Sequence, residues 1–124
     1  KDFNGLTRQP TWVDGSGLSR YNLFAPRDFI WVLTAMDSRF PANRLQAILP
    51  GANEGTLSGY YKGLEGSLYA KTGSLSGQVA LSGYLTTKKG KKLIFSILVN
   101  NHLTTGSVVR RSIEKFLLDI YNKY

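Results

Sequence analysis

The sequence predicts an α+β fold in which an antiparallel sheet of at least three strands, including a hairpin, packs against helices. Two observations lead to this prediction. Apolar runs between residues 67 and 100 alternate with short polar turns that contain glycine, which is typical of antiparallel strands. Apolar residues at helical spacing occur before and after this stretch, and helices that flank an antiparallel sheet belong to the α+β class.

The first helix is predicted to begin at Pro26 and to end before Pro41. Proline has the backbone angle of a first helical residue, and Asp28 in the first turn suits the positive end of the helix dipole. Apolar residues recur at helical spacing between these prolines. Because Pro41 stops the first helix, a second short helix is predicted over residues 43–49.

Three strands are predicted over residues 67–74, 79–86 and 93–100. A short polar turn that contains Gly90 joins the second strand to the third. The third run is apolar on both faces, which is typical of a buried strand. We therefore expect the third strand in the centre of the sheet and not at its edge.

A closing helix is predicted over residues 107–124, with Ser107 as its N-cap. Residues 1–24 and 51–66 are rich in glycine and small polar residues and are predicted as loops. One side of the closing helix is expected to face the core, through Val108, Ile113, Phe116, Leu117, Ile120 and Tyr121.

Composition limits the possible function classes. The chain has 124 residues, which suits one domain, and its formal charge of +8 favours an anionic partner. Nucleic acid, a membrane surface, a cell-wall polymer and a carboxylate substrate all remain open. The absence of cysteine excludes disulfides and cysteine nucleophiles, and the single histidine, His102, offers little material for a Ser–His–Asp triad. No apolar run is long enough to span a bilayer, and no cofactor is predicted.

The candidate site is Lys71-Thr72-Gly73-Ser74, at the end of the first predicted strand. Alternation along a strand puts the Thr72 and Ser74 hydroxyls on one face, and Gly73 lets another backbone approach closely. A peptide could pair with this strand edge while Lys71 supplies a cation for its terminal carboxylate. Alternation alone does not show that Lys71 reaches the side of the hydroxyls. The tetrapeptide alone also fits a solvated strand end before a turn.

Several short motifs occur in an order that resembles a known family, the class C low-molecular-mass penicillin-binding proteins. These proteins are D-alanyl-D-alanine carboxypeptidases and endopeptidases, and the resemblance covers roughly residues 12–122. The motifs, in chain order, are DGSGLSR at 14–20, LPG at 49–51, GTL at 55–57, AKTGSL at 70–75, LSGY at 81–84 and VNN at 99–101.

The resemblance implies roles for the candidate site. Lys71 would take part in the proton transfers and the electrostatics of serine acylation. Thr72 and Ser74 would bind the terminal carboxylate of the substrate, and Gly73 would keep the strand edge open. An oxyanion-hole donor would be a backbone N–H near Leu75 or Ser76.

The resemblance also implies substrates and a compartment. The parent enzyme would act on peptidoglycan peptides that end in D-Ala-D-Ala, and β-lactams would acylate its serine. It would be exported to the periplasmic or cell-wall side of a bacterial membrane, and no nucleic acid is expected as a partner.

The nucleophile that this family needs is missing from the expected place. The Ser-x-x-Lys and Ser-x-Asn motifs should both precede Asp14, and the one Ser-x-x-Lys match, Ser112 to Lys115, lies in the closing helix. We interpret that match as a coincidence. Residues 1–124 are therefore predicted to be a single C-terminal segment of a transpeptidase-like domain that lacks the catalytic serine and is inactive alone.

Other interpretations remain. The charge and the aromatic residues also fit a small basic binding module for nucleic acid or an anionic cell-wall polymer, and a separate chain could supply the missing serine. The lysines around Gly90 are interpreted as a solvated turn. Asp14, Ser16, Ser19 and Arg20 form a polar cluster with two interpretations: a loop near the site that positions substrate or catalytic groups, or a structural turn in which Asp14 and Ser16 bond local backbone. The structural turn is favoured. Tyr60-Tyr61 is a candidate wall of a substrate site.

Overall fold

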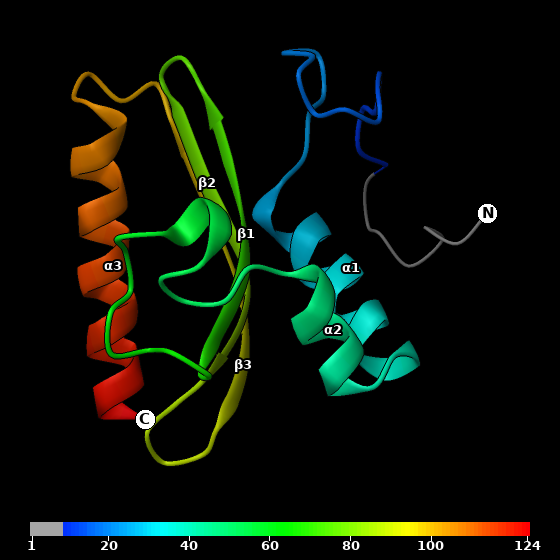
Figure 1. Cartoon of the computed structure of the whole chain (residues 1–124). Helices are drawn as coiled ribbons and strands as arrows, with labels where there is room; N and C mark the ends of the chain where they lie inside the picture. The colour runs from blue at the N-terminus through cyan, green and yellow to red at the C-terminus, as the bar shows by residue number, and fades with distance from the viewer. Residues whose placement is uncertain (1–8) are drawn as a thin grey trace.

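The computed structural model describes residues 9–124. Its sheet lies between helix α3 on one face and helices α1 and α2 on the other (Figure 1). The predicted α+β arrangement of strands and helices is confirmed. The elements in chain order are α1 (Pro26–Arg39), α2 (Ala42–Ile48), the 3-10 helix η1 (Gly55–Leu57), β1 (Leu68–Leu75), β2 (Gln78–Thr86), β3 (Lys92–Asn100) and α3 (Gly106–Lys123).

The three strands form an antiparallel meander in the order β1-β2-β3. Leu75 pairs with Gln78, so Ser76 and Gly77 alone connect β1 to β2. Gly77 has a φ of 74°, a left-handed conformation that glycine adopts without strain. Among residues 9–124, each of the three strands therefore pairs with its neighbour in the chain, and Gly51 adds an isolated antiparallel bridge to Tyr69 at the outer edge of β1.

The prediction that the third strand is central was wrong, because β3 lies at the edge of the described sheet. Its residues from Leu93 to Val99 are half-buried. Alternate side chains pack on opposite sides of the sheet: Phe95 joins the core under α3, and Ile94 joins the core under α1. The apolar character of both faces thus reflects two helical layers and not two flanking strands.

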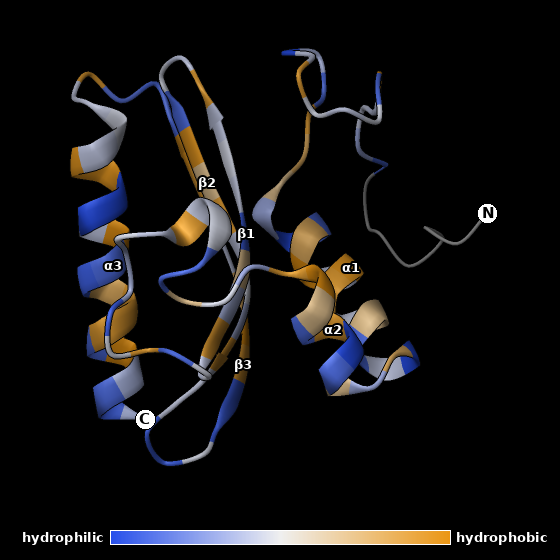
Figure 2. Ribbon diagram, in the orientation of Figure 1, coloured by the Kyte–Doolittle hydropathy of each residue, from blue (hydrophilic) through white to orange (hydrophobic). Residues whose placement is uncertain are grey.

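Two hydrophobic cores lie on the two faces of the sheet. The larger core joins α3 to the sheet, and the smaller one joins Leu33, Leu45 and Tyr84. The Tyr84 hydroxyl donates a buried hydrogen bond to the Leu33 carbonyl at 2.8 Å, which fixes α1 to β2. Figure 2 shows hydrophobic residues along the strands and on α1, and hydrophilic residues in the β2–β3 turn. The lysine side chains of that turn are exposed, which confirms the interpretation of a solvated turn.

Gly83 lies at a close approach between β2 and the backbone of β1. It pairs with Ala70 and is buried. A Cβ atom added at Gly83 would overlap the Tyr69 carbonyl oxygen and would lie 2.6 Å from the Ala70 Cα. The contact would be with backbone, so the sheet itself would have to move to relieve it.

Helix α1 begins as predicted, with Pro26 in its first turn. The Asp28 carboxylate accepts a hydrogen bond from the Ala25 amide at 2.7 Å, which satisfies a backbone donor that the helix leaves unpaired. Helix α3 begins one residue earlier than predicted, and its N-cap is Thr105 instead of Ser107.

The buried stripe of α3 also differs from the prediction. It runs through Val109, Ile113 and Leu117, which are spaced four residues apart. Val108 and Phe116 were expected in the core, but they are 52% and 54% exposed. A stripe that begins at Val109 turns both of these side chains to solvent.

The glycine-rich loop at 51–66 closes the larger core and is tied to α3 by Glu114. The Glu114 carboxylate accepts the Tyr61 amide at 2.5 Å and also pairs with Arg111, which lies over the Tyr60 ring. Tyr61 is 2% exposed, and its burial, with the nearby Glu114 charge, raises the pKa of its hydroxyl well above the ordinary value. The expectation that Tyr60-Tyr61 forms a substrate wall was therefore wrong for Tyr61, which is a core residue.

We expect the replacement Glu114→Ala to lower the free energy of unfolding by about 2 kcal/mol, because the largely buried Tyr61 amide would lose its charged acceptor. Glu114→Gln keeps an acceptor for that amide, so its loss should be about half as large. Urea unfolding of the three proteins measures both differences. Equal losses for the two variants would contradict this account.

Candidate functional site

The candidate site lies on the free edge of β1, beginning after Ala70. The Ala70 amide donates to the Pro50 carbonyl at 3.0 Å, so this residue turns its backbone groups away from β2. In an antiparallel strand every second residue does the same. Thr72 and Ser74 therefore turn their N–H and C=O groups outward, and no strand within residues 9–124 pairs with them.

Lys71 and the two hydroxyl side chains lie on opposite faces of β1. Thr72 and Ser74 share a face with Ala70, which packs in the core under α3, and Lys71 points to the other face. The Lys71 ammonium nevertheless reaches the free edge, because it donates a hydrogen bond to the Thr72 carbonyl at 2.8 Å. The structure thus brings a cation and two hydroxyls to one short stretch of strand edge.

The outward amides of this edge are those of Thr72 and Ser74. Leu75 pairs with Gln78 in the narrow pair that closes the β1–β2 hairpin, and its N–H is directed toward β2. The Leu75 amide therefore does not fit the expected oxyanion-hole donor, and Ser76, the other expected position, lies in the turn between β1 and β2. Ser74 is the last residue of β1 that combines an outward amide with a hydroxyl.

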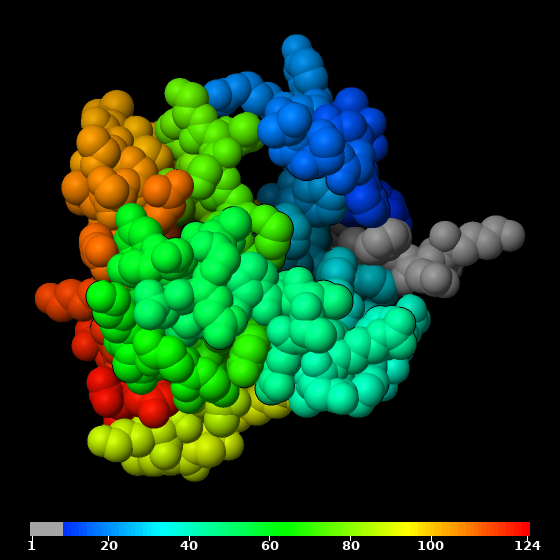
Figure 3. All heavy atoms as spheres, viewed as in Figure 1, coloured from blue at the N-terminus to red at the C-terminus, as the bar shows by residue number. Residues whose placement is uncertain are grey.

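Two arginines contact this end of the sheet, and one of them, Arg20, belongs to the motif at 14–20. Arg110, in the second turn of α3, donates to the Ser74 hydroxyl oxygen at 2.8 Å. Arg20 donates to the Ser76 carbonyl at 3.3 Å. Both bonds join residues more than 30 positions apart, so no local pattern in the sequence signals them. Figure 3 shows the segment that carries Arg20, in blue, beside the tip of the β1–β2 hairpin.

Asp14 organises the loop that carries Arg20. Its carboxylate accepts hydrogen bonds from the amides of Gly17 and Ser19 at 2.8 and 3.0 Å, and from the Ser16 hydroxyl and the Asn22 side chain. Desolvation acts to raise the pKa of Asp14, but these hydrogen bonds outweigh it and hold that pKa below its usual value. The interpretation of Asp14 and Ser16 as turn residues that bond local backbone is confirmed.

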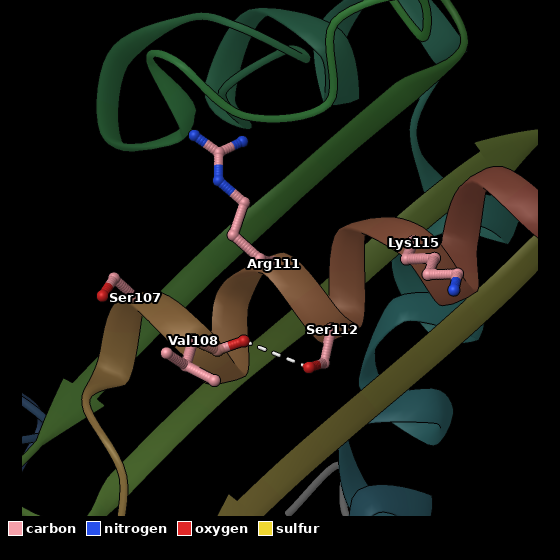
Figure 4. A pocket seen from close by; sticks show the side chains of 5 residues that line it. All are labelled: Ser107, Val108, Arg111, Ser112 and Lys115. Atoms are coloured by element: carbon pink, nitrogen blue, oxygen red, sulfur yellow. Dashed lines mark hydrogen bonds between the residues drawn. The ribbon is translucent and has the colours of Figure 1, made fainter.

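The Ser112 to Lys115 match does not form a nucleophile. Figure 4 shows both residues in a shallow depression on the surface of α3. The Ser112 hydroxyl donates to the Val108 carbonyl at 3.1 Å, a common bond for a serine within a helix. Within the described chain no hydrogen bond joins Ser112 to Lys115, so no base is in position to accept the serine proton.

Between residues 9 and 124, no three His, Asp or Glu side chains gather in a way that could hold a metal ion. The helices in this part of the chain are too short or too polar to cross a bilayer.

Residues 7–122 match the D-Ala-D-Ala carboxypeptidase 3 (S13) family. The chain belongs to this family. It is 34% identical over 119 residues to the D-alanyl-D-alanine carboxypeptidase DacB of Haemophilus influenzae, which covers 90% of this chain. It is 42% identical over 97 residues, 72% of this chain, to the D-alanyl-D-alanine carboxypeptidase of Actinomadura sp. strain R39.

Two solved structures have the same fold as this chain. A crystal structure of penicillin binding protein 4 from Haemophilus influenzae, complexed with a β-lactam, has a TM-score of 0.76 and 31% identity over 88% of this chain. A predatory endopeptidase from Bdellovibrio bacteriovorus, in complex with an immunity protein, has a TM-score of 0.76 and 25% identity over 93% of this chain.

The chain spans only part of these relatives. It covers 25% of the Haemophilus carboxypeptidase and 18% of the Actinomadura protein. It covers 28% and 33% of the two chains in the solved structures. These 124 residues therefore correspond to between 18% and 33% of the length of these relatives.

Proposed function

We propose that residues 1–124 are the C-terminal segment of a serine D-alanyl-D-alanine carboxypeptidase or endopeptidase, and that the edge of β1 binds the end of a peptidoglycan peptide. The observation that carries this proposal is the free edge itself. It presents two outward amides, the hydroxyls of Thr72 and Ser74, and the ammonium of Lys71 within four consecutive residues. Membership in the S13 family supports the same reading.

The edge is suited to a peptide that ends in a carboxylate. An extended peptide can pair with the outward N–H and C=O groups of Thr72 as an added strand. The hydroxyls of Thr72 and Ser74 can donate to the terminal carboxylate, and Lys71 and Arg110 supply positive charge nearby. Gly73 is exposed and leaves this part of the strand without a side chain on the Lys71 face.

The covalent step needs a serine from outside this chain. Its oxygen would attack the carbonyl carbon of the penultimate D-Ala, which breaks the C–N bond and releases the terminal D-Ala as the amine takes up a proton. Water would then hydrolyse the ester that forms. Lys71 would act in the proton transfers and in the electrostatics of this site, and Thr72, Gly73 and Ser74 would hold the substrate.

The names of the relatives support further parts of the proposal. One solved relative is a penicillin-binding protein in complex with a β-lactam. We therefore expect β-lactams to acylate the same serine in the protein that carries this segment. Because peptidoglycan lies outside the cytoplasm, this protein would be exported.

Intact mass after incubation with benzylpenicillin tests the proposal. The full-length polypeptide that carries this segment should gain the mass of one penicillin, and the 124-residue chain should gain none because it lacks an activated serine. If the short chain is acylated, Ser112 is reactive and our account of it is wrong. If neither protein is acylated, the carboxypeptidase assignment fails.

A basic binding module is the second candidate, because the chain has a formal charge of +8. Electrostatic binding of this kind weakens steeply with salt and does not distinguish one polyanion from another. Equal, strongly salt-dependent binding to DNA and to a polyphosphate, without acylation of the full-length polypeptide, would favour it. Two lysines in or beside the β2–β3 turn are already engaged, which argues against a free basic surface: Lys89 donates to the Lys123 carbonyl, and Lys92, at the start of β3, pairs with Asp37.

A further inference from the structure

The contact between Arg110 and Ser74 joins α3 to the candidate site. Arg110 is half-buried, and its guanidinium passes over the first turn of α3, 3.9 Å from the point where a Cβ of Gly106 would lie. From there it reaches across to β1 and donates to the Ser74 hydroxyl oxygen at 2.8 Å. Helix α3 thus brings a charged group to the strand edge on the face opposite Lys71.

The direction of this hydrogen bond constrains the Ser74 hydroxyl. A guanidinium can only donate, so the Ser74 oxygen must accept. The single hydroxyl proton of Ser74 then remains available for another acceptor. Ser74 can therefore donate this proton at the free edge, which suits a carboxylate.

The charge of Arg110 is not used by another ion pair. The neighbouring Arg111 pairs with Glu114, and Lys92 pairs with Asp37. Across residues 9–124, no carboxylate lies within ion-pair distance of Arg110. Its positive charge is thus available to an anion that approaches Ser74.

We propose that Arg110 is a positioning residue for carboxylate recognition, which holds the Ser74 hydroxyl as a donor and adds positive charge at the edge of β1. This inference rests on the proposed function and deepens it, because it assigns part of the carboxylate selectivity to α3. Lys71 and Arg110 then approach the bound carboxylate from opposite faces of the same strand.

The test compares benzylpenicillin with its carboxyl methyl ester on the full-length polypeptide, with the acylation rate as the readout. The unchanged protein should react faster with the free acid. Arg110→Gln should lower the rate with the free acid about tenfold and leave the rate with the ester unchanged, because the lost positive charge attracts the carboxylate of the acid and not the neutral ester. Arg110→Lys should retain most of the rate, because it keeps the charge.

Lys115→Gln is the matched control, since it removes one positive charge from an exposed position on the same helix. It should change neither rate. Equal losses for acid and ester in Arg110→Gln, or no loss for either, would overturn the role of Arg110. If Arg110→Gln does not fold, Ser74→Ala decides: it should lose the same selectivity, and retained selectivity would overturn the inference. If the unchanged protein reacts with neither compound, the proposed function itself fails.

Discussion

Replacing Gly83 with alanine is expected to lower the free energy of unfolding by about 3 kcal/mol or more, at the upper end of what overpacking costs. The added Cβ would overlap the Tyr69 carbonyl oxygen and lie within 2.7 Å of the Ala70 Cα and Cβ. These are backbone and near-backbone atoms of the paired strand, so no side-chain rotation relieves the clash. Urea unfolding, followed by far-ultraviolet circular dichroism, measures the loss.

Gly15→Ala is the matched control for this prediction. No atom lies within 4 Å of the position of its added Cβ, and its φ is not in the left-handed region. Its free energy of unfolding should change by less than about 0.5 kcal/mol. A loss at Gly83 no larger than the change at Gly15 would mean that the two strands separate easily at this point.

Replacing Lys71 with methionine in the full-length polypeptide is expected to slow acylation by benzylpenicillin about a thousandfold. Proton transfer by a positioned side chain contributes rate factors of about 10² to 10⁴, and the ammonium of Lys71 lies at the strand edge where the substrate would bind. Methionine keeps most of the side-chain length and removes the charge. The readout is the second-order rate constant of acylation.

Lys88→Met serves as the control, because Lys88 is exposed in the β2–β3 turn at the other end of the strands. It should react at the unchanged rate. Both lysines are exposed, so neither variant should change the free energy of unfolding by more than about 0.5 kcal/mol. Acylation of the Lys71 variant at the unchanged rate would remove Lys71 from the catalytic proposal.

Patterns along the chain predicted the elements to within a residue or two. Pro26 and Pro41 marked the limits of α1, and apolar alternation marked the three strands, because these signals depend on local backbone geometry. The position of β3 could not be predicted in this way. The polarity of the side chains indicates whether the two faces of a strand are covered. Which strands lie beside it in the sheet depends on backbone hydrogen bonds, and the side-chain pattern does not reveal these.

The candidate site could also be predicted from the sequence only in part. The order of Lys71, Thr72, Gly73 and Ser74 in one strand was visible in the sequence, and the resemblance to penicillin-binding proteins gave those residues a meaning. Whether the Lys71 ammonium reaches the edge depends on its rotamer, which alternation does not determine. The approach of Arg110 depends on how α3 crosses the sheet, and that is a property of the packed core.

The connectivity of the three strands also affects when the site forms during folding. Because β1 pairs with β2 across two residues, and β2 pairs with β3 across a short turn, the loops that must close to build the sheet are small. Closing small loops costs little chain entropy, and folds rich in such local contacts form quickly. The edge that carries Lys71 can therefore be in place early in folding, as a template on which more distant segments of the chain later assemble.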